Sequence, residues 1–267
     1  MPRVPVFGFL KRRRRARLRA QPIPPEWREI VKRNVPLFRR LPPEDGEELL
    51  RKVRVFLAEK RFEGCGGLEL TDEMRVTVAA QACLPILKLD DDYYPRLRSI
   101  LVYPDTFVAR RERREGAVVH EGHESLLGES WQGGAVVLSW ASVRAGAANP
   151  LDGENVVLHE FAHQLDQEDG APDGTPVLHS WSAYGPWARV LSEDYLELRE
   201  SVAKGREELL DAYGATDEAE FFAVASQTFF EKPVALEREH PELYDQLRAY
   251  YRQDPAALLS ARPEKDA

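Results

Sequence analysis

The 267-residue sequence is poor in cysteine and has no long apolar run. Its two cysteines, Cys65 and Cys83, form no C-x-x-C pair, so we expect reduced core thiols rather than a disulfide framework or a redox motif. No stretch approaches the roughly 18 apolar residues that a membrane span requires. No apolar stretch follows the basic start either, as a secretory signal would need. These absences predict a cytoplasmic protein without a membrane span.

Acidic residues are missing from residues 1–20, which carry eight basic ones. The rest of the chain holds 29 basic and 45 acidic residues, a net charge of −16, and such an acidic body argues against direct binding of nucleic acid. The basic run 11–15 is typical of contact with nucleic acid or anionic lipid, or of a targeting signal. Because the Pro-rich residues 21–25 follow it, we interpret residues 1–25 as a basic flexible tail.

Histidine is rare as well, yet two of the six histidines lie four residues apart. Residues 159–163 read His-Glu-Phe-Ala-His, the H-E-x-x-H pattern of zinc metallopeptidases. On an α-helix His159 and His163 are one turn apart on the same face, so both imidazoles reach one metal ion. Glu160 then lies beside the metal, where it takes a proton from the attacking water. The alternative is a surface helix with two solvated histidines.

The residues around this pattern favour a buried helix. Asn149-Pro150 and Asp152-Gly153 supply turn and capping residues upstream, and the segment from Val156 to Leu165 is largely apolar. Buried histidines need polar partners, which a metal ion provides. Asp166 either orients a ligand histidine as a hydrogen-bond acceptor or helps to end the helix.

The remaining pattern predicts an α+β fold. Helical periodicity covers most of residues 26–97, and strand-forming runs at 99–103, 106–109, 118–120 and 135–140 predict one small mixed sheet. The run 135–140 is either an edge strand that binds substrate backbone beside the metal or an inner strand. We interpret His120 and His123 as surface histidines. Residues 166–176 form an acidic loop whose Asp169 and Asp173 hint at calcium without the EF-hand spacing. Further helices are predicted from Pro186, over 220–230 and from Pro241.

Catalytic zinc takes three protein ligands and keeps one position open. The metzincin continuation is excluded, because Asp166 and Asp169 stand where glycine and a third histidine would be. Glu220 begins an otherwise apolar helix, where an unpaired buried carboxylate would be costly and a metal would stabilise it. The sequence leaves other candidates for the third ligand open: Glu197, Glu200, Glu218 and His179.

The sequence resembles the Mlc titration factor A family of bacterial zinc peptidases. The matching stretches are residues 79–85, 102–104, 155–166, 213–217, 219–224, 229–231 and 240–244, in the expected order. The resemblance implies a zincin-like, gluzincin-type catalytic domain, similar to that of anthrax lethal factor, with additional N- and C-terminal helices. Carried over by position, it implies one zinc ion per chain, bound by His159, His163 and Glu220, with Glu160 as the base and Tyr213 assisting at the site. Gln227 departs from the glutamate expected at its position.

These observations predict a single zinc-peptidase domain over residues 26–255. It would comprise a helical part, 26–97, and a catalytic part, 98–255, followed by a C-terminal tail, 256–267. The predicted reaction is peptide-bond hydrolysis by a zinc-activated water, and the resemblance suggests aminopeptidase-like activity. The alternative is a non-catalytic regulatory protein that binds and sequesters an Mlc-type transcription repressor. Because the chain keeps all four core residues of the site, the sequence favours the enzyme, with the repressor as an additional partner.

Overall fold

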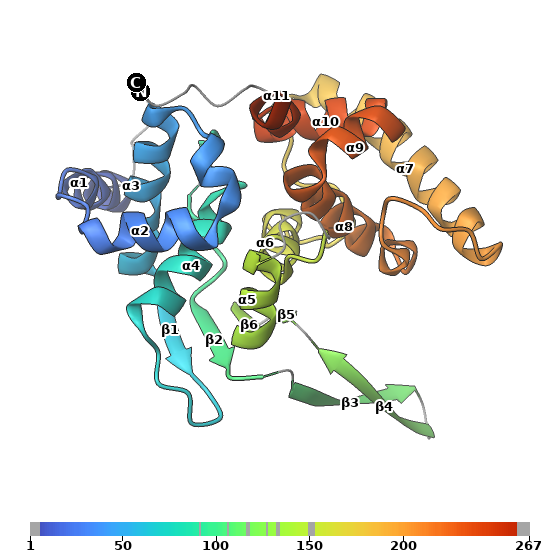
Figure 1. Ribbon diagram of the computed structural model, residues 1–267. Helices are drawn as coiled ribbons and strands as arrows, with labels where there is room; N and C mark the ends of the chain where they lie inside the picture. The colour runs from blue at the N-terminus through green and yellow to red at the C-terminus, as the bar shows by residue number, and fades with distance from the viewer. Residues whose placement is uncertain are drawn as a thin grey trace.

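The computed structural model describes residues 6–90, 92–105, 107–115, 118–126, 128–131, 134–148 and 153–260. Within these ranges the chain has the predicted α+β fold, with many helices around a small sheet (Figure 1). No helix in this part of the chain is both long enough and apolar enough to cross a membrane.

The N-terminal part of the chain is helical. Its elements are α1 (Val6–Arg19), α2 (Pro25–Asn34), the 3-10 helix η1 (Pro36–Arg40), α3 (Pro43–Glu59) and α4 (Asp72–Cys83). Prolines begin α2 and α3, where a missing backbone N–H costs nothing because the first turn leaves it without a helical partner. Thr71 caps α4 by accepting a hydrogen bond from the backbone N–H of Met74 at 3.2 Å.

Helix α1 lies where we predict a flexible tail, and the structure corrects that interpretation for residues 6–19. Arg15 pairs with Glu59 at 2.6 Å and Arg19 pairs with Glu48 at 2.6 Å, and both carboxylates belong to α3. Leu18 packs against the hydrophobic core. The partners of these arginines are 29 and 44 residues away in the sequence, so the basic run alone does not reveal them.

The main sheet has four strands in the order β1-β2-β6-β5. They are β1 (Arg61–Gly64), β2 (Ser99–Tyr103), β5 (Gly128–Trp131) and β6 (Ala135–Ser139). β1, β2 and β6 run parallel, and β5 is antiparallel to β6, which makes the sheet mixed as predicted. Because β1 comes from the predicted helical part and pairs with β2 of the predicted catalytic part, the two parts share one sheet.

The prediction that all the strand-forming runs belong to one sheet is wrong. β3 (Phe107–Glu115) and β4 (Val118–Leu126) pair only with each other in the described topology, and they extend away from the main sheet (Figure 1). Residues 110–115 of β3 are all charged, so the sequence of this stretch lacks the alternating apolar residues of a strand that packs on a core. His120 and His123 lie on β4, and the interpretation of their side chains lies outside the described residues.

Strand β6, which precedes the helix with the H-E-x-x-H pattern, is an inner strand of the sheet. This is the second of the two alternatives that the sequence leaves for residues 135–140. β6 lies between β2 and β5, so β5 is the edge strand on that side. β6 ends at Ser139, and α5 (Trp140–Ala148) follows it before the metal helix begins. The strand therefore does not lead directly into that helix.

The rest of the chain is helical. Its elements are α6 (Val156–Asp166), α7 (Trp181–Ala203), the 3-10 helix η2 (Ala212–Ala215), α8 (Glu218–Glu231), α9 (Pro233–Glu239), α10 (Pro241–Tyr251) and α11 (Pro255–Ser260). α7 begins at Trp181, ahead of the predicted start, and contains Pro186. α11 occupies the first part of the predicted C-terminal tail, and residues 261–267 lie outside the described ranges.

Helix α6 lies between the N-terminal helices and the C-terminal helices (Figure 1). On the N-terminal side, the ring of Phe161 packs against Tyr94 and Phe56, with centroid distances of 4.8 Å and 5.7 Å. On the C-terminal side, α6 packs along α8. Buried contacts on two sides hold α6 in place, which matters because it carries the H-E-x-x-H pattern.

Candidate metal centre

The helix that carries His159 and His163 begins at a side-chain cap. The carboxamide oxygen of Asn155 accepts hydrogen bonds from the backbone N–H groups of Val157 and Leu158, both at 3.1 Å. These bonds satisfy two of the amides that the first turn of a helix leaves without partners. The N-cap of α6 is thus Asn155, and residues 149–152 of the predicted capping segment lie outside the described ranges. The cap at Asn155 fixes the start of α6 at Val156, three residues before His159.

The helix that carries Glu220 is capped in the same way. The carboxylate of Asp217 accepts a hydrogen bond from the backbone N–H of Glu220 at 2.9 Å. Glu220 thus lies in the first turn of α8, where the helix dipole favours a negative charge. All the residues from Phe221 to Glu231 are buried, so the packing of α8 on α6 sets the position of the carboxylate.

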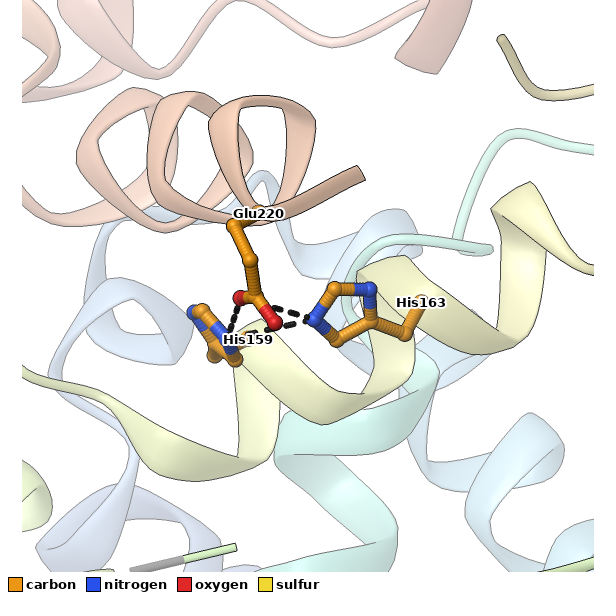
Figure 2. Close-up of side chains that lie close together, drawn as sticks. All are labelled: His159, His163 and Glu220. Carbon is orange, nitrogen blue, oxygen red and sulfur yellow. Dashed lines mark hydrogen bonds and ion pairs between the residues drawn. The ribbon is translucent and has the colours of Figure 1, made fainter. Parts of the chain in front are cut away.

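The side chains of His159, His163 and Glu220 converge on one point (Figure 2). The Glu220 carboxylate oxygen lies 3.0 Å from Nε2 of His159 and 3.2 Å from Nε2 of His163. The two Nε2 atoms are 3.3 Å apart. The three side chains are 10–19% exposed, so the cluster is sheltered but reachable from solvent.

The donor set and its spacing fit a zinc ion. Two ligand atoms about 2.1 Å from one tetrahedral zinc lie about 3.4 Å apart, and the three observed separations of 3.0–3.3 Å are close to that value. Two neutral imidazoles and one carboxylate carry a single negative charge, which suits a divalent cation. Three protein ligands also leave one position open, as in catalytic rather than structural zinc sites.

The two histidines also control the charge of Glu220. Burial acts to raise the pKa of this carboxyl, but the hydrogen bonds with His159 and His163, and the positive charge of these rings when they are protonated, hold the pKa well below its usual range. Glu220 is therefore ionised at neutral pH, and an ionised carboxylate is the form that binds a metal.

The two predicted catalytic residues, Glu160 and Tyr213, come from different elements. Glu160 follows His159 on α6 and is only 4% exposed. Tyr213 belongs to η2, is 54% exposed, and its ring centroid lies 6.1 Å from that of His159. The structure therefore brings Tyr213 to the rim of the cluster formed by His159, His163 and Glu220. The catalytic roles of Glu160 and Tyr213 stay predictions.

Close packing of η2 explains how Tyr213 reaches this place. The carboxylate of Asp211 accepts a hydrogen bond from the backbone N–H of Tyr213 at 2.7 Å. A Cβ atom on Gly214 would lie 3.2 Å from Leu198 of α7 and 3.2 Å from Val224 of α8. η2 can therefore lie close between α7 and α8 because residue 214 has no side chain.

Asp166 lies at the end of α6 and is completely buried. Burial raises its pKa to about 6, while the nearby backbone amides of Gly174 and Thr175 and the charge of His163 act to lower it. Within the described residues neither carboxylate oxygen of Asp166 makes a hydrogen bond, so both interpretations of this residue stay predictions.

The two aspartates of this loop that hint at calcium, Asp169 and Asp173, have hydrogen-bond partners within the loop itself. The Asp169 carboxylate accepts a hydrogen bond from the backbone N–H of Ala171, and that of Asp173 accepts one from Thr175. Each therefore stabilises a local turn of its own loop.

The rival third ligands lie elsewhere. Glu197, Glu200 and Glu218 are exposed, and Glu200 pairs with Lys204. His179 is 2.7 Å from the backbone oxygen of Tyr250 through its Nε2 atom. Within the part of the chain whose side chains are described, His159, His163 and Glu220 are the one group of three metal-type ligands that converge.

Gln227, where we expect a glutamate, has a structural contact of its own. Its side-chain amide donates a hydrogen bond to the backbone oxygen of Gly153, shortly before α6 begins. An ionised glutamate could not donate this bond. In the sequence, Gln227 stands out only as a departure from the expected glutamate. Its hydrogen bond links α8 to the segment just before α6, and the partner lies 74 residues away in the sequence.

Comparisons with known proteins agree with this geometry. The family model described as glucose-regulated metallo-peptidase M90 matches residues 9–252. A Synechocystis protein, slr2042, is 41% identical over 244 residues, which cover 91% of this chain and 89% of the relative. Mlc titration factor A from Yersinia enterocolitica is 32% identical over 238 residues, covering 88% and 87%. The protein of the same name from Yersinia pestis is 31% identical over 238 residues, covering 88% and 86%.

Proposed function

The chain belongs to the M90 family of glucose-regulated metallopeptidases, and on this premise we propose that it is a zinc-dependent peptidase that hydrolyses peptide bonds. The observation that carries the proposal is the convergence of two imidazole nitrogens and one carboxylate oxygen within 4.8 Å of one another. In this proposal His159, His163 and Glu220 bind one zinc ion per chain.

Each residue of the site then has a distinct task. A bound zinc ion supplies a Lewis acid that activates water and polarises the scissile carbonyl. The Glu160 carboxylate takes a proton from the attacking water and delivers it to the leaving amine. The Tyr213 hydroxyl donates a hydrogen bond to the oxygen that becomes negative as the water adds. The position of Tyr213 at the rim of the cluster supports that role.

Finer features rest on the sequence resemblance. A glutamate as third ligand from a later helix is the gluzincin arrangement, and we extend the proposal to that type and to aminopeptidase-like cleavage of short peptides. We also propose a cytoplasmic location, because Cys65 and Cys83 form no disulfide and thiols stay reduced in that compartment.

A second function is favoured by the names of the relatives. Proteins named Mlc titration factor A match 88% of this chain at 31–32% identity. We therefore propose an Mlc-type repressor as an additional partner. The net charge of −8 suits a basic DNA-binding protein, because opposite charges speed association.

The substitution Glu160→Gln tests the catalytic proposal. We expect the purified wild-type protein to contain about one equivalent of zinc and to cleave members of a peptide library. Glu160→Gln should keep the zinc, since Glu160 is not a proposed ligand, and should lose cleavage because an amide cannot accept the proton. Cleavage by Glu160→Gln at the wild-type rate would show that the base is another residue.

The repressor proposal needs a separate readout. Binding of a purified Mlc-type repressor, measured by calorimetry, should be the same for wild type and Glu160→Gln if the two functions are independent. The absence of binding to wild type would remove the second function and leave the peptidase proposal intact.

A further inference from the structure

The outward face of α1 has no role in the proposed peptidase. We propose that this face is a docking surface for an anionic lipid bilayer, which holds the protein peripherally at a membrane. It is defined by Phe9, Leu10, Arg12, Arg13 and Arg17, with Ala16 between them.

Helical geometry divides α1 into two sides. With about 100° per residue, the residues of the outward face fall on an arc of roughly 160°. The residues that hold α1 to the body, among them Lys11, Arg15 and Leu18, fall on the opposite arc. Arg12 and Ala16 form one edge of the outward face, where they border a surface hollow between α1 and the body. Docking through the outward face therefore leaves these internal contacts intact.

The arginines of the outward face are available for an external anion. Arg12, Arg13 and Arg17 are all exposed. Among the described residues, no hydrogen bond or ion pair involves any of the three, whereas Arg15 and Arg19 are paired with carboxylates. Three guanidinium groups on one face are thus free to contact anionic headgroups.

Exposed apolar side chains on the same face favour a lipid surface over a nucleic acid. Phe9 is 60% exposed and Leu10 is 55% exposed. Exposed Phe and Leu side chains can enter the boundary between headgroups and acyl chains, while the neighbouring arginines contact anionic headgroups. A surface that binds nucleic acid by charge alone would gain nothing from Phe9 and Leu10.

The negative charge of the rest of the chain determines how the protein is oriented on an anionic membrane. Residues 21–267 have a net charge of −16, so an anionic surface repels most of the molecule and attracts α1. α1 lies at the outer edge of the molecule, away from α6 and α8 (Figure 1). The body and its metal site therefore stay in solution when α1 docks.

Vesicle co-sedimentation of the full chain tests the proposal. The probes are vesicles of phosphatidylcholine alone and vesicles of phosphatidylcholine and phosphatidylglycerol in equal parts. The wild-type protein should sediment with the mixed vesicles and not with the neutral ones, and binding should weaken as salt is added. Equal sedimentation with both kinds of vesicle, or none with either, would overturn the proposal.

A charge variant locates the surface. Each basic residue near an anionic leaflet contributes a factor of about five in affinity, so the combined change Arg12→Gln, Arg13→Gln and Arg17→Gln should weaken binding about 100-fold. Its folding is checked by circular dichroism and zinc content, which the three exposed positions should not alter.

The matched control removes the same charge elsewhere. Arg40, Arg75 and Arg206 are exposed and belong to other parts of the chain, and the combined change of all three to glutamine should keep most of the affinity. If this control loses as much affinity as the α1 variant, the binding reflects total charge and the proposal fails.

A second variant separates lipid from nucleic acid. Phe9→Ser with Leu10→Ser should remove the binding to mixed vesicles that persists at higher salt, because that part comes from burial of apolar groups. Tighter binding of the wild type to a single-stranded RNA oligomer than to the mixed vesicles, unchanged by Phe9→Ser and Leu10→Ser, would overturn the lipid proposal.

Discussion

Replacing Phe161 with alanine tests how firmly the fold holds the helix that carries the proposed metal ligands. The Phe161 side chain is completely buried and packs against Tyr94 and Phe56, with centroids 4.8 Å and 5.7 Å away. Truncation of a buried phenylalanine to alanine costs about 3–5 kcal/mol. Because aromatic pairs contribute about 0.5–1.5 kcal/mol each beyond area burial, we expect the upper end of this range, a loss of about 4–5 kcal/mol in the free energy of unfolding.

Urea unfolding followed by circular dichroism measures this loss. Zinc should be chelated throughout, since a ligand that binds only the folded state adds its own stabilisation. Trp181→Ala is the matched control, because Trp181 is an aromatic residue that is 91% exposed. Its change should stay within about 0.5 kcal/mol. A loss below about 2 kcal/mol for Phe161→Ala would refute the reasoning, because it would mean that the aromatic contacts do not fix α6.

Three further predictions concern the metal, a buried ion pair and a helix cap. Zinc at 100 times its dissociation constant should raise the free energy of unfolding of the wild type by about 2.7 kcal/mol. Glu220→Gln should abolish most of this gain at the same zinc concentration. Thermal unfolding with and without a chelator measures both effects. The His240 ring nitrogen lies 2.6 Å from the Asp194 carboxylate, and this hydrogen bond raises the pKa of His240 although burial acts to lower it. Because the folded-state pKa of His240 is raised, the stabilisation is complete below the ordinary pKa of about 6.5 and declines as the pH rises through the folded-state value. His240→Ala should therefore lower the free energy of unfolding by about 1–3 kcal/mol at pH 5.5 and by less at pH 9. An equal loss at both pH values would contradict the ion pair. Asn155→Ala should remove the cap of α6 and cost about 1 kcal/mol, whereas Asn155→Asp, which keeps an oxygen that can accept the two backbone hydrogen bonds, should cost much less in the same urea titration.

The sequence by itself determined the features that depend on neighbours along the chain. The spacing of His159 and His163 places both on one face of a helix, because helical geometry is local. The residue types predicted a metal site, since two imidazoles with an intervening carboxylate fit the pattern of a zinc peptidase. The helix over 72–83 and the strand 99–103 also followed from periodicity and capping. The helix predicted over 220–230 exists as well, and the structure extends it to 218–231. Glu220 stood among several candidates until the family resemblance selected it.

Tertiary structure decided everything that depends on residues far apart in sequence. The packing of α8 on α6 brings Glu220 to within 3.2 Å of both histidines, across 57 and 61 residues, and no local pattern encodes that distance. Carboxylates of α3 hold α1 against the body, which turned a predicted tail into a helix with one bound face and one free face. Strand pairing made β6 an inner strand, because the position of a strand in a sheet depends on its partners and not on its own residues.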